Sequence, residues 1–209
     1  MTAKANPRLK AAEALMALLA ERGWNDISLS DVAQKAEMSL ADLRALVSCK
    51  EALMPVLGAE IDRRVLLDFN KADPALPVRD RLFDVLMRRL EALTPYKPAF
   101  RRLAQDGAKS PSALLAAAVS IDRAMPWMLE AAGVGSSGLA GRLKAKALAA
   151  VYLSAAKVWL GDDAPDLGPT MGALDKGLDR CERLLGLVPG PLRACLLGQK
   201  GGNPVPSTT

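Results

Sequence analysis

The sequence predicts an all-α protein, and three observations support that prediction. Apolar residues recur three and four positions apart along nearly the whole chain of 209 residues, which is the spacing of amphipathic helices. Runs in which apolar and polar residues alternate, as they do in half-buried strands, are absent from the sequence. Half of the residues are hydrophobic, so the chain can bury a large core. We therefore expect eight or nine helices and no sheet.

Capping residues place short helices at the start of the chain. Asn6 followed by Pro7 is typical of a helix start. Ser28 or Ser30 caps the second helix, and Ser39 caps the third after a tight turn. This arrangement is typical of a helix-turn-helix. Helices are expected over residues 7–22, 31–36, 40–47 and 50 to about 70.

Prolines mark the organisation of the remaining chain. Pro55 must kink or delay the fourth helix, and Pro126 should bend the helix that it interrupts. Pro74 and Pro77 lie in a linker. Further helices are expected at about 78–94, 97–106, 111–132, 139–160 and 170–186. We expect a head over residues 1–50, a body over 51–188 and a flexible tail over 189–209.

The composition excludes most catalytic chemistry. The chain has no histidine, which removes histidine bases, Ser-His-Asp triads and nearly every catalytic zinc site. Its three cysteines (Cys49, Cys181 and Cys195) lack metal-binding spacing and are expected to be reduced thiols. We find no signal peptide and no run of roughly 18 to 20 apolar residues. We therefore expect a cytoplasmic protein that is not an enzyme and uses no cofactor or metal.

The N-terminal segment resembles a known family. The residues that carry the likeness are Ala-Glu-Arg-Gly-Trp at 20–24, Ile-Ser-Leu-Ser-Asp-Val-Ala at 27–33, Ala36, Ser39, Leu43 and Lys-Glu-Ala-Leu at 50–53. In order and spacing they resemble the TetR family of transcriptional regulators. The resemblance implies a TetR-like architecture: a three-helix DNA-reading head and a larger helical body that dimerises and binds a small molecule.

The resemblance also implies which residues meet DNA. The helix over 40–47 would enter the major groove, while hydroxyl, amide and basic groups around it would hold phosphates. The implied DNA-binding residues are Ser28, Ser39, Leu40, Asp42, Arg44 and Lys50.

The head departs from the family pattern in its charge. The turn contains Glu37 where the family usually has glycine, and Asp42 lies on the reading helix. Residues 1–66 hold nine Lys/Arg and nine Asp/Glu, so the net charge of +5 belongs to the rest of the chain. A neutral head gains little affinity from counterion release. A helix-turn-helix kept only as scaffold therefore remains an alternative.

The body carries a second resemblance. Residues 79–82, 88–96 and 150–153, and the acidic turn over 162–166 after Trp159, resemble the TetR-like lipid-binding family of ubiquinone biosynthesis. That likeness implies a hydrophobic ligand or lipid, and a quinone-biosynthesis enzyme as partner. The leading hypothesis is a ligand-responsive regulator that binds DNA as a dimer. The alternative is a lipid- or isoprenoid-binding accessory protein that does not bind DNA.

Large and soft apolar side chains of the body are the candidates for a ligand pocket. A cavity walled by methionine and aromatic residues suits an elongated hydrophobic ligand. The same residues could instead simply fill the core. The candidates are Phe83, Met87, Phe100, Met125, Trp127, Met128, Tyr152 and Trp159.

Small apolar residues in the last two helices predict a homodimer. Such faces permit close helix packing, and in TetR-like proteins the equivalent pair forms a four-helix interface. Packing within one chain is the alternative. The residues are Ala147, Leu148, Ala150, Val151, Ala155, Gly172, Leu174 and Leu178.

Three further patterns are not interpreted as sites. The glycine-rich string over 133–138 follows a helix rather than a strand, so we expect a loop and no dinucleotide site. The aspartates of residues 162–166 precede a helix, whose dipole explains them. Arginine pairs at 63–64, 88–89 and 101–102 are expected on solvated helix faces, although a cluster of them could meet an anionic partner.

Overall fold

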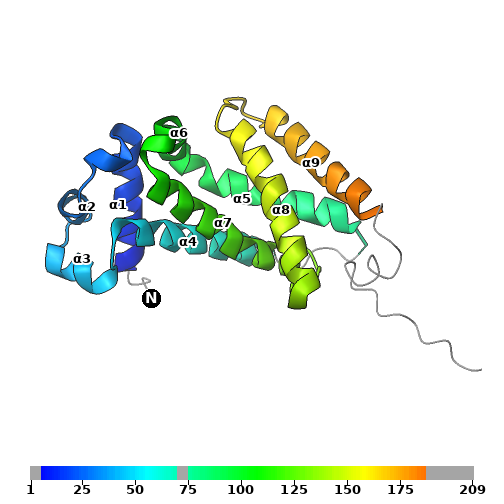
Figure 1. Ribbon diagram of the computed structural model, residues 1–209, viewed down its shortest axis with the longest axis horizontal. Coiled ribbons are helices and arrows are strands. Elements are labelled where there is room, and N and C mark those ends of the chain that lie inside the picture. Colours follow the sequence, from blue (N-terminus) through cyan, green and yellow to red (C-terminus); the bar gives the residue numbers. More distant parts are fainter. Residues whose placement is uncertain (1–5, 70–74, 187–209) are drawn as a thin grey trace, which may run out of the picture.

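The computed structural model describes residues 6–69 and 75–186, and over these ranges its regular structure is entirely helical. The predicted all-α class is confirmed. The first three helices, which we call the head, form one end of the molecule (Figure 1). They are α1 (Pro7–Glu21), α2 (Leu29–Lys35) and α3 (Leu40–Leu46), and α4 (Leu53–Asp68) leads into the body.

The body packs its helices in pairs. Helix α4 lies along α7, α7 continues against α8, and α8 packs along α9, while α6 covers α1 of the head (Figure 1). The short connections let neighbouring helices bury their apolar stripes against one another. The helices of the body are α5 (Val78–Leu93), α6 (Lys97–Asp106), α7 (Pro111–Ala131), α8 (Gly138–Trp159) and α9 (Gly168–Gly186).

Two prolines have different effects on their helices. Residues 50–52 form a 3-10 turn, so α4 begins three residues later than its predicted start, with Pro55 in its first turn. A proline there removes no helical hydrogen bond. Helix α7, in contrast, continues through Pro126 to Ala131 without a break. The predicted tail over 189–209 lies outside the described residues, as does most of the predicted linker.

One hydrophobic core runs from the head into the body. In the head, Trp24 and Leu43 are buried and belong to this core. In the body, Gly58 of α4 permits close approach to α7, because a Cβ atom there would lie 2.0 Å from the Ser120 hydroxyl. Within the described ranges, no helix is long and apolar enough to cross a membrane.

Candidate DNA-binding face and ligand pocket

Two capping boxes build the helix-turn-helix. The backbone N–H of Asp31 donates to Ser28 Oγ (3.1 Å) and that of Ser28 donates to Asp31 Oδ2 (2.8 Å), which fixes the start of α2. The same arrangement occurs at α3. The backbone N–H of Asp42 donates to Ser39 Oγ (3.0 Å), and that of Ser39 donates to Asp42 Oδ2 (3.3 Å). Each box satisfies two backbone donors at a helix start. The Asp42 carboxylate is therefore part of the helix start.

The turn between α2 and α3 contains an unusual residue. Glu37 has a φ of +51°, in the left-handed region that favours glycine. Its carboxylate accepts a hydrogen bond from Lys10 Nζ at 2.6 Å, which lowers the pKa of Glu37. This ion pair neutralises the negative charge that distinguishes the turn from the family pattern.

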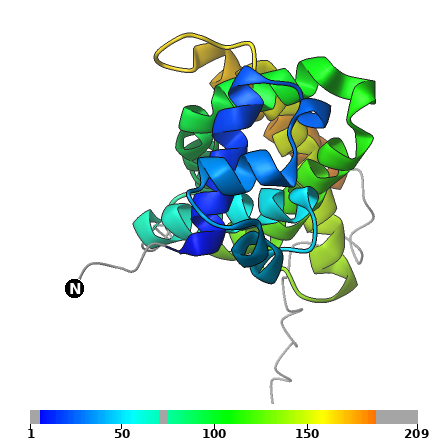
Figure 2. The same ribbon diagram turned by 90° about the vertical axis from the view of Figure 1, so that its left-hand side faces the viewer.

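Helix α3 lies at the end of the head (Figure 2) and exposes both apolar and charged side chains. Five residues of the helix are exposed, whereas Leu43 is buried and anchors the helix to the head. The exposed residues are Leu40, Ala41, Asp42, Arg44 and Ala45. Arg44 forms no ion pair within the part of the chain that the structure describes. Its guanidinium is therefore available to an anionic partner.

The ammonium group of Lys50 points back into the head. It donates to the carbonyl oxygens of Trp24 and Ile27, both at 2.6 Å, and lies 4.5 Å from the centroid of the Trp24 ring. Burial lowers the pKa of Lys50. Lys50 therefore connects the start of α4 to the segment between α1 and α2.

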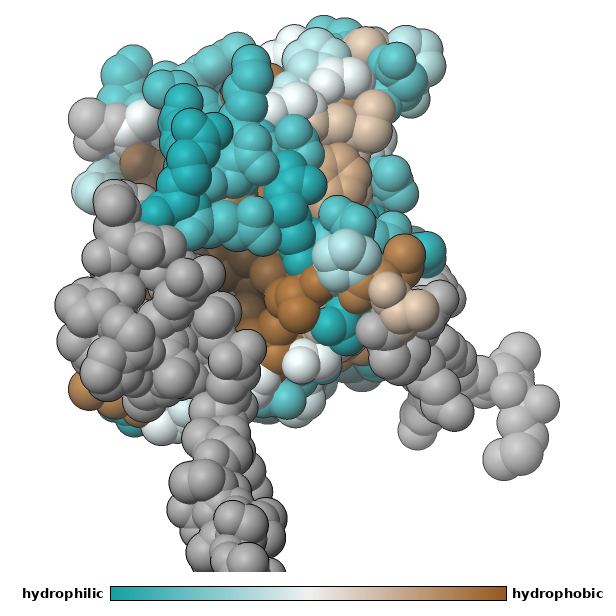
Figure 3. All heavy atoms as spheres, turned by 90° about the vertical axis from the view of Figure 1, so that its right-hand side faces the viewer, coloured by the Kyte–Doolittle hydropathy of each residue, from teal (hydrophilic) through white to brown (hydrophobic). Residues whose placement is uncertain are grey.

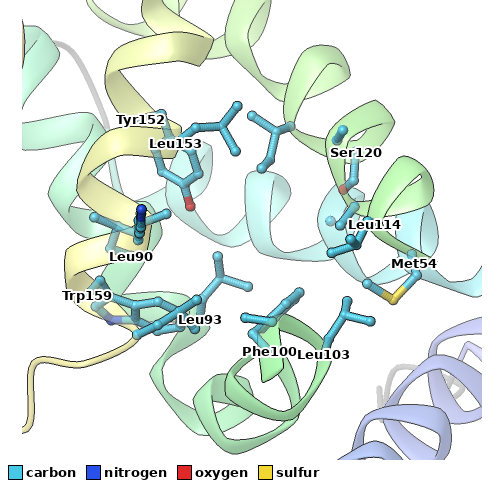
Figure 4. Close-up of a pocket in the computed structure, with 18 of the residues that line it drawn as sticks. Met54, Leu90, Leu93, Phe100, Leu103, Leu114, Ser120, Tyr152, Leu153 and Trp159 are labelled. Atoms are coloured by element: carbon cyan, nitrogen blue, oxygen red, sulfur yellow. The ribbon is translucent and has the colours of Figure 1, made fainter. Parts of the chain in front are cut away.

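The body encloses a pocket of about 270 Å³ between α4, α5, α6, α7 and α8 (Figure 4). Its walls are almost wholly apolar, and side chains from all five helices converge on it. Ligand pockets in proteins commonly measure about 300 to 1,000 Å³, so this one suits a small ligand. Labelled residues of its wall are Met54, Leu90, Leu93, Phe100, Leu103, Leu114, Ser120, Tyr152, Leu153 and Trp159.

The eight predicted ligand residues have different positions. Phe100, Tyr152 and Trp159 line this pocket. Trp127 is exposed and lines a separate surface depression between α4 and α7. The remaining four do not line the pocket and belong to the core or pack against it; they are Phe83, Met87, Met125 and Met128.

Sequence reasoning missed the polar centre of the pocket. The adjacent arginines of α5 were expected on a solvated face, which is wrong for Arg89: its side chain is buried, whereas Arg88 is exposed. Arg89 Nε donates to Asp62 Oδ1 at 2.8 Å, and its NH1 group donates to the Tyr152 hydroxyl at 2.6 Å. The signal was available, because position 89 falls in the apolar stripe formed by Leu86 and Leu93.

Helix α6 links the pocket to the head. Phe100 lies in the pocket wall, and Asp106 at the end of the same helix accepts a hydrogen bond from the backbone N–H of Trp24 at 3.2 Å. Just beyond α6, the carbonyl of Lys109 accepts from the side chain of Asn25 at 2.7 Å. A displacement of α6 would therefore pull on the segment between α1 and α2 through these hydrogen bonds.

Hydrogen bonds and an ion pair hold the acidic turn between α8 and α9. Asp162 accepts from the backbone N–H (3.0 Å) and hydroxyl (2.5 Å) of Thr170, which lowers the pKa of Asp162. Asp163 pairs with Arg101 at 2.7 Å, and the buried Lys97 ammonium donates to the Asp162 carbonyl. Among the described residues, no group of three potential metal ligands occurs.

The glycine-rich string over 133–138 connects α7 to α8, as predicted. Gly133 and Gly138 have φ values of +73° and +68°, which glycine adopts without strain. A helix precedes the loop, so the strand that a dinucleotide fingerprint requires is absent from this position.

Comparisons with solved structures identify the fold. The chain is similar to a TetR transcriptional regulator from Nitrosomonas europaea, with 22% identity and a TM-score of 0.64 over 84% of this chain and 98% of the other. A TetR regulator from Rhodococcus sp. RHA1 gives 21% identity and a TM-score of 0.59, with 83% and 94% of the two chains covered. A TetR-family regulator from Streptomyces coelicolor has 17% identity and a TM-score of 0.54, over 93% of this chain and 84% of the other.

No family model and no curated protein matches the sequence. The likeness therefore rests on the arrangement of the helices. That arrangement extends over head and body together, because more than four fifths of each chain is covered in all three comparisons. The chain has the fold of the TetR transcriptional regulators.

Proposed function

We propose that this protein is a ligand-responsive transcriptional regulator that binds DNA as a dimer through α3. The observation that carries the proposal is the exposed face of α3, held by a capping box at the end of a TetR-like head. In helix-turn-helix proteins, the second helix of the motif enters the major groove with its first residues against the base edges.

The exposed residues of α3 define how bases would be read. Leu40 and Ala41 suit apolar contact with thymine methyl groups, and Arg44 suits a phosphate or a guanine edge. Ser28, Ser39 and Asp42 hold the motif in shape through the two capping boxes. Lys50 holds the segment before α2 in place, so it contributes to DNA binding mainly by positioning α2.

Three of the six cations over residues 6–50 already have partners within the chain. Lys10 is paired with Glu37, Arg22 lies 3.8 Å from Asp31, and Lys50 points inward. The salt dependence of DNA binding is therefore expected to be shallow, because each neutralised phosphate contributes about 0.9 to the slope. Specificity would come from shape and apolar contacts with the bases more than from charge.

The pocket provides the input to this regulator. A ligand between the five helices would contact Phe100 and Leu103 of α6, and α6 holds the backbone of Trp24 through Asp106. In the proposed dimer, the two heads must have the spacing that fits DNA. A ligand changes DNA affinity if it binds the protein with this spacing more weakly or more tightly than the protein with another spacing.

Dimerisation is proposed through α8 and α9. Leu148, Val151 and the other larger residues of the predicted interface are buried within the chain, where α8 packs on α9. Leu143, Ala147 and Ala150 of α8 remain exposed on one stripe. At the end of the body opposite the head, the surface shows apolar patches among polar side chains (Figure 3). A second copy could bury this stripe.

The accessory-protein alternative receives less support. The pocket lies below the usual size range of ligand sites, which disfavours a long acyl or isoprenoid chain. The three solved structures described above are all transcriptional regulators.

Selection of DNA from a random duplex library tests the proposed function. The wild-type chain should enrich one sequence with two-fold symmetry, while Leu40→Asp, which places a charge on the reading face, should enrich none. Leu115→Asp, on an exposed position of α7, is the matched control and should enrich the same sequence as the wild type. Failure of the wild-type chain to enrich any sequence would refute the proposal.

A further inference from the structure

Arg89, Tyr152 and Asp62 form a buried polar cluster beside a mostly apolar cavity. The cavity is also lined by Ser120 and by Trp159, whose buried Nε1 has no hydrogen-bond partner among the described residues. Arg89 and Tyr152 both line the pocket, and both side chains are at most 2% exposed. Asp62 lies behind Arg89 and accepts its Nε hydrogen at 2.8 Å. Burial of three polar side chains is unfavourable unless they are paired, so this cluster constrains which ligand the pocket can accept.

The cluster of Arg89, Tyr152 and Asp62 has almost no net charge. The carboxylate of Asp62 balances the guanidinium of Arg89 through their ion pair. Around it the walls are mostly hydrocarbon, and the remaining charged residue of the lining, Lys157, is exposed at the edge. An anionic group brought to the cluster would be buried without a free countercharge, which is costly in such surroundings.

The hydroxyl of Tyr152 is a donor without an acceptor. Its oxygen already accepts from Arg89 at 2.6 Å, so the proton of Tyr152 must point elsewhere. Within residues 6–69 and 75–186, no protein group accepts that proton. Figure 4 shows the hydroxyl directed toward the pocket from α8, with Ser120 on the opposite wall. The hydrogen bond from Arg89 also polarises the hydroxyl and makes it a stronger donor.

We propose that the pocket takes a neutral, largely apolar molecule with one oxygen acceptor, such as a ketone or ester, which accepts the hydrogen bond of Tyr152. The inference rests on the proposed function only in treating the pocket as the ligand site. Burial raises the pKa of Tyr152, so the hydroxyl stays protonated and remains a donor at neutral pH.

Two probes of equal length test the charge of the ligand. 2-Nonanone has one carbonyl oxygen, and nonanoate is ionised at pH 7.4. Titration calorimetry on the wild-type chain without DNA should show 2-nonanone binding about tenfold tighter or more. Nonanoate binding as tightly or tighter would overturn the inference, and so would the absence of heat with both probes. Loss of a nonanoate preference in Lys157→Gln would then assign recognition to the edge of the pocket.

Infrared spectroscopy tests the hydrogen bond directly in the wild-type protein. The carbonyl stretch of ¹³C-labelled 2-nonanone should lie below its frequency in hexane and near its frequency in an alcohol, because a donor weakens the carbonyl bond. Tyr152→Phe should shift the band toward the hexane position and weaken 2-nonanone binding about five- to tenfold. A hexane-like band in the wild type would contradict the assignment, even where Tyr152→Phe does not fold.

These measurements separate the inference from the proposed function. All of them use the protein without DNA, so a chain that fails to select DNA can still show the expected ketone binding. A preference for nonanoate, conversely, would overturn the ligand class and leave a DNA-binding regulator intact.

Discussion

At the scale of single residues, Glu37 is the clearest departure from a standard helix-turn-helix. Its left-handed backbone is strained for a non-glycine residue by about 1 to 2 kcal/mol. The ion pair with Lys10 offsets little of this strain, because the Glu37 side chain is 80% exposed and solvent screens the attraction. Glu37 also pairs with Lys10, one of the cations of the head.

We expect Glu37→Gly to raise the free energy of unfolding by up to about 1 kcal/mol, since glycine relieves the strain. DNA binding should strengthen, with a salt slope steeper by about one unit per head, because Lys10 becomes available to a phosphate. Urea denaturation and anisotropy titrations measure the two effects. The double variant Glu37→Gly, Lys10→Ala should lose the gain in DNA affinity and is the control. An unchanged slope in the single variant would refute this role of Lys10.

Glu60 predicts a pH dependence of stability. Hydrogen bonds from Arg63 and Arg64, each at 2.8 Å, lower the pKa of Glu60 to about 2 from 4.5. A depressed folded-state pKa contributes stability that is complete above pH 4.5 and is lost as pH falls toward 2. The melting temperature of the wild type should exceed that of Glu60→Gln at pH 5, and the difference should shrink toward pH 2. A difference that stays constant over this range would contradict the assignment.

At the scale of elements, the sequence predicted each helix but not how the helices meet. Capping serines and apolar spacing placed α2, α3 and α6 to within two residues, because those signals are local. The burial of Arg89 was predictable from its place in the apolar stripe of α5, but its partner was not, since Asp62 lies 27 positions away on another helix. Likewise Gly58 gave no local signal for its close approach to Ser120.

Helix α6 should transmit the ligand signal through Asp106. With 2-nonanone as ligand, DNA affinity of the wild type should change at least about fivefold, the lower end of typical allosteric coupling. Asp106→Ala removes the hydrogen bond to the Trp24 backbone, so ligand and DNA binding should persist separately while the coupling shrinks.

Binding of each ligand in the absence and presence of the other measures this coupling. The control is Asp84→Ala, which removes an exposed carboxylate paired with Arg88 on α5 and should leave the coupling intact. Full coupling in Asp106→Ala would show that the signal takes another route.

At the scale of the whole molecule, the fold was predictable and the pocket only in part. Three of the eight residues proposed for ligand binding line the pocket, because large apolar residues serve core and cavity alike. Whether such a residue fills the core or lines a cavity depends on which helices leave space between them. Helical periodicity in one sequence does not contain that information.

The proposed dimer predicts a change of assembly state. Leu143→Glu places a charge on the exposed stripe of α8, so light scattering after size exclusion should show a monomer in place of the wild-type dimer. Leu115 of α7 is at least as exposed as Leu143, and Leu115→Glu should remain dimeric. A monomeric wild type, or a dimeric Leu143→Glu, would exclude this interface.

The central claim is that α3 reads DNA, and one titration tests it most directly. Fluorescence anisotropy with DNA from upstream of the protein's own gene, from about 50 to 200 mM salt against scrambled competitor, gives affinity, specificity and salt slope together. We expect binding that survives competition, with a shallow slope that Arg44→Ala flattens by about one unit per head. Binding that scrambled DNA abolishes, or that Arg44→Ala leaves unchanged, would contradict the account.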